Sequence, residues 1–215
     1  MSMDHALENY RQGNYPAALE HWLPLAENGD ADSQAWIGTL YEGGLGVEVS
    51  DAKAFEWYLR SALAGNRLAQ NNVGAMYGLG KGVDQSFANA AKWLAKAAEQ
   101  GDTHAMFNLA VFHMKGQGVD RNVDLALSWY RRAAELGHTP SQARLGYLYC
   151  GNDDVPKNRI EAFVWLTLAA NHGAGHALNA LEPVQEQMSL EEKQAAQARL
   201  GGFLGRRVAD PARVS

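Results

Sequence analysis

Two histidines near the end of the chain have a spacing that could bind a metal ion. His172 and His176 are four residues apart, so on a continuous helix both imidazoles would lie on one face, as zinc ligands. However, Gly173 and Gly175 lie between them, and Gly173 is expected to end a helix. No Cys, Asp or Glu follows at ligand spacing. We therefore expect no metal site.

Residue patterns for catalysis are also missing from the sequence. There is no Gly-x-Ser-x-Gly elbow, no His-Glu-x-x-His motif and no Walker-type loop. The single cysteine, Cys150, cannot form an intrachain disulfide and has no evident activating partner. We expect no enzymatic activity and no cofactor.

A glycine motif that resembles a phosphate-binding loop occurs three times. Gly-x-Gly-Val stands at residues 44–47, 80–83 and 116–119, and Asn152-Asp153-Asp154-Val155 takes its place in the next repeat. Dinucleotide binding would need a preceding strand and a third glycine, and neither is present. Because Asn and Asp are the residues that best tolerate positive φ after Gly, the pattern indicates a backbone requirement in all four loops.

These motifs belong to a repeat of 36 residues. Tryptophan recurs at this period at Trp57, Trp93, Trp129 and Trp165, and glycine at Gly29, Gly65, Gly101, Gly137 and Gly173. Apolar residues within each period follow the i, i+4, i+7, i+8 spacing of a helix face. Helix N-caps are expected at Asp30, Asn66, Asp102, Ser50, Ser86, Asn122 and Asn158. Each period therefore predicts two antiparallel helices.

The complete pattern resembles the Sel-one-like repeat family over about residues 3–182. Its signature is Ala-x-x-x-x-Gly-x-x-Tyr (Ala69, Gly74, Tyr77), then Gly-x-Gly-Val, then Ala-x-x-Trp-Tyr/Leu-x-x-x-Ala-x-x-Gly. That family is a cousin of the tetratricopeptide repeat, so the resemblance implies an all-α, right-handed α-solenoid, or α–α superhelix. The stretch around Gly13 lacks the Gly-x-Gly-Val insert and looks more like a plain tetratricopeptide hairpin.

We expect one repeat domain over residues 1–205. Its hairpins are predicted at about 3–29, 30–65, 66–101, 102–137 and 138–173. A C-terminal pair over 174–205 follows, with one helix at about 174–187 and another from the capping box Ser189-Leu190-Glu191-Glu192 to about Gly201. Residues 206–215 are expected to form a flexible tail.

Two recurring columns are expected to serve packing. The tryptophans are predicted to lie buried between successive helices. The small residues Gly38, Gly74, Ala110 and Gly146 inside the first helices are expected to mark close helix crossings.

The resemblance also implies a concave groove lined by the first helix of each pair, which in tetratricopeptide domains binds peptides. The predicted partner-binding residues are Trp36, Asn71, Asn72, Phe107, Asn108, Val111, Arg144 and Tyr147. An Asn amide can pair with an extended backbone, and Arg can hold a carboxylate by its planar fork. The alternative is that Asn72 and Asn108 only bond to a neighbouring repeat.

We expect a non-enzymatic adaptor that binds a protein or peptide. The alternatives are a protein that binds a small anionic ligand or cell-wall fragment, around Arg144, Tyr147 and His104, and a self-associating structural protein. A net charge of −5 argues against a nucleic-acid partner. No apolar run approaches the ~18 residues of a membrane span, and the first residues lack the features of an export signal. A cytoplasmic location without membrane contact is therefore expected.

Overall fold

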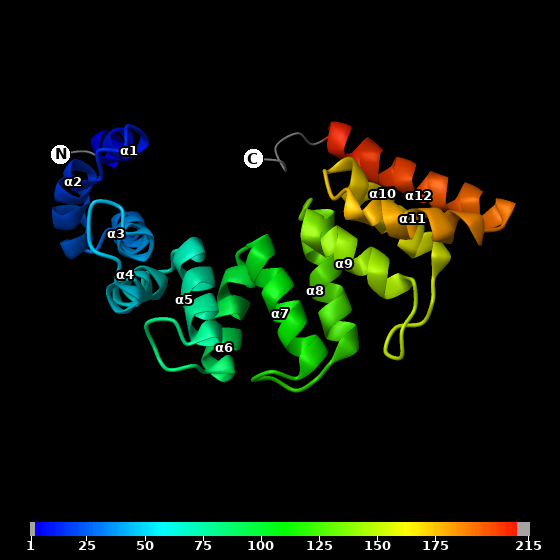
Figure 1. The fold of residues 1–215 in the computed structure, drawn as a ribbon, viewed down its shortest axis with the longest axis horizontal. Coiled ribbons are helices and arrows are strands. Elements are labelled where there is room, and N and C mark those ends of the chain that lie inside the picture. The colour runs from blue at the N-terminus through cyan, green and yellow to red at the C-terminus, as the bar shows by residue number, and fades with distance from the viewer. Residues whose placement is uncertain (1–2, 210–215) are drawn as a thin grey trace. The chain divides into compact units, whose positions relative to one another are not determined.

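The structure, a computed structural model, describes residues 3–209 of the 215 in the chain. Within these residues it contains twelve α-helices and no strand, in the order that Figure 1 traces. The first six helices are α1 (Met3–Arg11), α2 (Tyr15–Glu27), α3 (Ala31–Gly43), α4 (Asp51–Leu63), α5 (Arg67–Leu79) and α6 (Phe87–Glu99). The remaining six are α7 (Thr103–Lys115), α8 (Val123–Glu135), α9 (Thr139–Tyr149), α10 (Arg159–Asn171), α11 (His176–Glu186) and α12 (Leu190–Ala209). The predicted all-helical repeat is confirmed.

The chain forms two compact units. Unit 1 comprises the residues up to Ala105 together with 117–120, and unit 2 comprises 106–116 and the residues from Arg121 onward. In unit 1 each helix from α1 to α5 packs against the next. In unit 2, α9 packs against α8, α10 and α11, and α12 packs against α10. Both units are therefore built by stacking consecutive helices.

The helix starts follow the predicted capping residues. Asp30 Oδ2 accepts a hydrogen bond from the backbone N–H of Ser33 at 2.8 Å, and Asn66 Oδ1 accepts one from Ala69 at 2.9 Å. The second helices begin in the same way. Their caps are Ser50, Ser86, Asn122 and Asn158, each bonded to the N–H three residues later. Each cap satisfies one of the donors that a helix start leaves unpaired.

Close backbone approach explains the second glycine of the Gly-x-Gly loops. A Cβ on Gly82 would lie 2.2 Å from the carbonyl oxygen of Asp51, and a Cβ on Gly118 would lie 2.2 Å from the carbonyl carbon of Phe87. Gly82 and Gly118 also have φ values of 70° and 69°. Each loop therefore rests on the start of the second helix of the preceding repeat, and only glycine fits there.

The fourth loop differs from the prediction. No residue other than glycine has positive φ in the described part of the chain, so Asn152, Asp153 and Asp154 do not adopt the expected conformation. The positive φ lies at Gly151, at 99°. Asn152 Oδ1 instead accepts hydrogen bonds from the backbone N–H groups of Asp154 and Val155, at 2.9 and 2.8 Å. The Asn therefore turns the chain with its side chain.

The small residues of the first helices do mark close helix crossings. A Cβ on Gly38 would lie 2.7 Å from the ring of Tyr58, and a Cβ on Gly74 would lie 2.7 Å from Leu94. A Cβ on Gly146 would lie 2.6 Å from Leu166.

The tryptophan column is not the buried column that we predicted. Trp57, Trp93 and Trp129 are only half-buried. A basic side chain three residues later lies over each ring, and the distances from the cation to the ring are 4.7, 4.2 and 5.4 Å in that order. The fully buried column is the next one along the chain, which consists of Tyr58, Leu94, Tyr130 and Leu166. The period identifies equivalent positions, but it does not show which of two adjacent ones faces the core.

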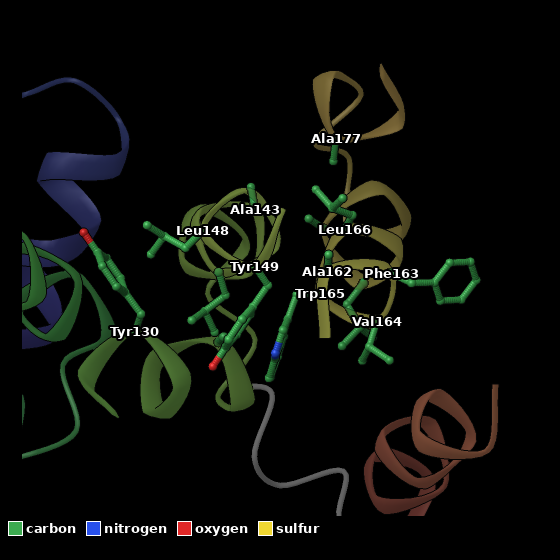
Figure 2. Packing of buried hydrophobic residues seen from close by; sticks show 14 of the residues in the cluster. Tyr130, Ala143, Leu148, Tyr149, Ala162, Phe163, Val164, Trp165, Leu166 and Ala177 are labelled. Atoms are coloured by element: carbon green, nitrogen blue, oxygen red, sulfur yellow. The ribbon is translucent and has the colours of Figure 1, made fainter. Parts of the chain in front are cut away.

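Trp165 is the exception in the tryptophan column, because its side chain is fully buried. The ring of Phe203 on α12 lies 5.0 Å from the indole, and the indole N–H donates to Glu161 Oε2 at 2.8 Å. Figure 2 shows Trp165 and Phe163 leaving α10 in opposite directions. Arg199 on α12 completes the arrangement with an ion pair to Glu161 at 2.7 Å. In the last repeat α12 therefore covers the tryptophan ring, whereas in the earlier repeats a basic side chain lies over it.

The C-terminal helices differ in length from the expectation. The capping box is confirmed, since Glu192 N–H donates to Ser189 Oγ at 3.1 Å and Ser189 N–H donates to Glu192 Oε2 at 2.9 Å. The helix then continues to Ala209 and does not end near Gly201. Residues 206–209 of the expected tail are thus helical, and 210–215 lie outside the described residues. No helix in the described range is long and apolar enough to cross a bilayer.

Candidate functional site

Trp36 is part of an aromatic cluster at the start of unit 1. Its ring stacks on that of Trp22, with centroids 5.3 Å apart and planes 4° from parallel, and it lies 5.0 Å from the ring of Tyr10. Trp22 is fully buried and Trp36 is half-buried. Packing between α1, α2 and α3 therefore already gives Trp36 a structural role.

Asn72 on α5 acts on a buried tyrosine of the preceding helix. Burial raises the pKa of the Tyr58 hydroxyl, and hydrogen bonding from Thr39 and Asn72 opposes that rise. Tyr58 also donates to Glu42 at 3.0 Å. This contact with the neighbouring helix corresponds to the structural alternative for Asn72. The adjacent Asn71 has a buried Oδ1 with no hydrogen-bond partner among the described residues.

Three of the predicted binding residues come together in unit 2, around a pocket of about 400 Å³. Phe107 reaches it from α7, and Arg144 and Tyr147 reach it from α9. The other lining residues are Thr139, Pro140, Ala143, His172, Gly173, Ala174 and His176. Asn108 and Val111 lie half-buried on α7 and do not line the pocket, and neither does His104.

The walls of the pocket are held in place by contacts that the lining residues make with one another and with residues outside the pocket. The Tyr147 hydroxyl donates to the backbone carbonyl of His176 at 3.0 Å, and the two rings stack with centroids 6.1 Å apart. The His172 Nδ1 lies 2.7 Å from Gln142 Oε1. Phe107 packs edge-on against Tyr130 at 5.3 Å. A binding partner would therefore meet aromatic walls whose positions are already fixed.

Arg144 supplies the permanent charge of the pocket. Its side chain is exposed, and it forms no ion pair with any residue in the described part of the chain. Burial raises the pKa of the Tyr130 hydroxyl, and the positive charge of Arg144 opposes that rise. The guanidinium thus lies between a buried phenol and solvent, where its remaining donors can bind an anion.

The residues considered for metal binding and catalysis serve other roles. No group of three or more potential metal ligands occurs among the described residues. His172 and His176 both line the pocket, on either side of the break that Gly173 introduces. Burial raises the pKa of the Cys150 thiol, and its Sγ lies 3.4 Å from the Gly146 carbonyl oxygen. A thiol whose pKa is raised is not activated as a nucleophile.

Some lining residues could not be identified from the sequence. Thr139 and Pro140 open α9, and Gly173 and Ala174 lie in the turn between α10 and α11. The sequence predicts a helix after this turn, but only the contact between α11 and α9 shows that the turn closes one side of the pocket. The spacing of His172 and His176 indicates only a possible metal site and does not predict that they line this pocket.

A chain of repeated antiparallel helix pairs, joined by loops that rest on the preceding repeat, is an α-solenoid. The model of the Sel1 repeat matches residues 31–66, 67–102, 103–138 and 139–173, so this chain belongs to the Sel1 repeat family. These matches confirm the 36-residue period. Proteins of the family are generally protein-interaction modules and typically non-enzymatic scaffolds.

Solved structures show the same fold. A protective antigen of uropathogenic Escherichia coli with an SLR fold is 34% identical, with a TM-score of 0.76 over 89% of this chain. This chain spans only 42% of the length of that protein. A Sel1 repeat protein from Oxalobacter formigenes is 29% identical, with a TM-score of 0.75 over 88% of this chain and 87% of its own.

A more distant similarity shows the fold alone. An immunity protein from Pseudomonas aeruginosa is 21% identical, with a TM-score of 0.53 over 80% of this chain and 68% of its own. No curated protein matches the chain significantly.

Proposed function

We propose that this chain is a non-enzymatic adaptor that holds a protein or peptide partner, and that the pocket of unit 2 is its principal contact. The observation that carries the proposal is a preformed pocket with aromatic walls and one guanidinium, that of Arg144, which has no ion pair among the described residues. Aromatic residues and arginine are the side chains that contribute most often to the affinity of protein interfaces.

The polar groups of the pocket support binding over catalysis. The Tyr147 hydroxyl is engaged with a backbone carbonyl, and the His172 ring is engaged with Gln142. No Ser, Cys, Asp or Glu is among the lining residues. Membership of a family of interaction modules points in the same direction.

The test is affinity capture of a partner from host-cell lysate. The three purified proteins used as bait are wild type, Arg144→Gln and Arg132→Gln. Arg132 is a matched control, because it is an exposed arginine of the same unit that lies over Trp129 outside the pocket. Each protein must first show the wild-type melting curve. We expect a discrete partner that wild type and Arg132→Gln retain and Arg144→Gln loses. Equal retention by all three would move the binding face away from this pocket.

The small volume of the pocket, about 400 Å³, also favours the second candidate, a small anionic ligand such as a cell-wall fragment. Muramyl dipeptide, which carries one free carboxylate, is a suitable probe for calorimetric titration. Saturable binding that Arg144→Gln abolishes would favour this candidate, and no heat change would exclude this fragment.

The structure gives the self-association alternative no specific support. An exposed apolar patch in the first forty residues would have favoured it. Within described residues 3–40, Leu23 is the one large apolar side chain that is exposed, at 38%.

A further inference from the structure

The fourth repeat differs chemically from the others at the pocket. The position of Arg144 is occupied by Trp36, Asn72 and Asn108 in the earlier repeats, so a permanent charge occurs at this position once. The position of Tyr147 is occupied by Thr39, Ala75 and Val111. The combination of a cation with an exposed aromatic ring is therefore specific to this repeat and is not a property of the repeat pattern.

The charge of the pocket is positive and uncompensated. No Asp or Glu lines it, and Arg144 has no ion pair within the described residues. A partner that brings a carboxylate to Arg144 gains a charge-assisted, bidentate hydrogen bond. A partner that brings a lysine meets repulsion with no acidic residue to relieve it.

The walls of the pocket favour an apolar group beside that carboxylate. Phe107, Pro140, Ala143 and Ala174 contribute apolar surface, and the ring of Tyr147 is 38% exposed. A volume of about 400 Å³ is at the small end of the range for ligand pockets, which suits one large side chain and its neighbours. Arg144 and Ala143 both line the pocket, so a ligand in it can reach the charge and the apolar wall together.

We propose that this pocket selects a peptide segment in which a large apolar side chain stands directly beside Asp or Glu. The apolar side chain fills the pocket, and the side-chain carboxylate pairs with the Arg144 guanidinium. This inference rests on the proposed function as a peptide-binding module, and it specifies the chemistry of the partner.

The test is a peptide array with fixed central pairs and randomised flanks, with every peptide N-acetylated and C-amidated. The pairs combine Phe, Leu or Ser with Asp, Ser or Lys, and the array is probed with wild type, Arg144→Glu, Arg144→Lys and Arg132→Glu. For wild type we expect Phe-Asp and Leu-Asp to be retained about tenfold more than Phe-Lys, which lacks the charge-assisted hydrogen bond. They should also be retained about tenfold more than Ser-Asp, because serine has no large apolar side chain to bury in the pocket. Arg144→Glu should reverse the Asp-over-Lys preference, and Arg132→Glu should leave it unchanged.

The variants and a second array separate the sources of an effect. Arg144→Lys should keep the acidic preference with weaker retention, because it keeps the charge and loses the planar fork. If wild type retains peptides without an acidic preference, this inference fails and the peptide-binding function stands. If wild type retains no peptide at all, both this inference and the peptide-binding function fail at this pocket.

A parallel array with free C-termini tests the terminal carboxylate, and retention confined to that array would overturn the assignment to a side chain.

Discussion

The side-chain amide of Gln100 donates a hydrogen bond to the Oε1 of Gln70 over 2.7 Å. Gln70 in turn donates from its Nε2 to the backbone carbonyl of Ala62 at 3.2 Å. The same link recurs in unit 2, where Gln142 bonds to His172 at 2.7 Å and donates to Ala134 at 3.0 Å. A buried glutamine thus joins the ends of two successive second helices.

In the first full repeat this link is incomplete, and one substitution should restore it. Gln34 donates to Ala26 at 2.9 Å, but its buried Oε1 has no partner among the described residues, because the donor position holds Ala64. The backbone angles at Ala64 are −76° and 1°, close to the −78° and 2° at Gln100. Ala64→Gln should stabilise the protein by about 1 kcal/mol and raise the Tm by about 2–4 °C. Urea denaturation measures this change, and an equal gain in a Gln34→Met background would show that the hydrogen bond is not its source.

Alanine substitution at two glycines with positive φ should have unequal costs. At Gly101, with φ 92°, a Cβ would meet open space, so Gly101→Ala should cost only about 1–2 kcal/mol for the left-handed backbone. At Gly82 the Cβ would also collide with the backbone of Asp51, so Gly82→Ala should cost at least ~2 kcal/mol more. Chemical denaturation of both variants decides, and equal costs would contradict the close packing of this loop.

The tryptophans should separate by burial rather than by repeat position. Trp165→Ala should cost about 3–5 kcal/mol, since the indole is fully buried and its N–H holds Glu161. Trp93→Ala should cost roughly half as much, because its half-buried ring packs against Lys96 at the surface. Urea midpoints of the two variants give the comparison. A larger loss at Trp93 would restore the buried interpretation of the whole column.

Acid should loosen the start of α12 through Glu192. The backbone N–H of Ser189, and then Arg159, hold the pKa of this carboxyl below its usual value of 4.5. A carboxyl with a lowered pKa in the folded state stabilises that state above the unfolded pKa, and this contribution is lost as the pH falls through the folded value. The loss should therefore begin as the pH drops to about 4.5 and be complete below the folded pKa.

Glu192→Gln removes the ionisable group and tests this pH dependence. Stability measured from pH 6 to pH 3 should fall less steeply in the variant than in wild type. Parallel curves would show that other carboxyls dominate the acid response.

Local chemistry made much of the fold predictable from the sequence. Ser50 and Asn66 cap helices because their side chains bond to amides three residues away, and this requires only short-range geometry. Burial depends on distant contacts, so the repeat pattern predicts a core position for the Trp57 column although its neighbour Tyr58 is the buried residue.

The candidate site was predictable to a similar extent. Arg144 and Tyr147 stand out because they depart from the residues that the repeat has at their positions. His172 and Ala174 line the pocket only because α11 packs back against α9, and no spacing in the sequence encodes that contact. The departure from the period was therefore more informative about the site than the period itself.

The seating of each Gly-x-Gly loop on the preceding repeat has a consequence for evolution. Gly82 meets Asp51, and Gly118 meets Phe87, each thirty-one positions earlier in the chain. If a repeat were deleted at the ends of its hairpin, the second glycine of a Gly-x-Gly loop would be separated from the helix start on which it packs. Viable duplications and deletions should therefore preserve this spacing.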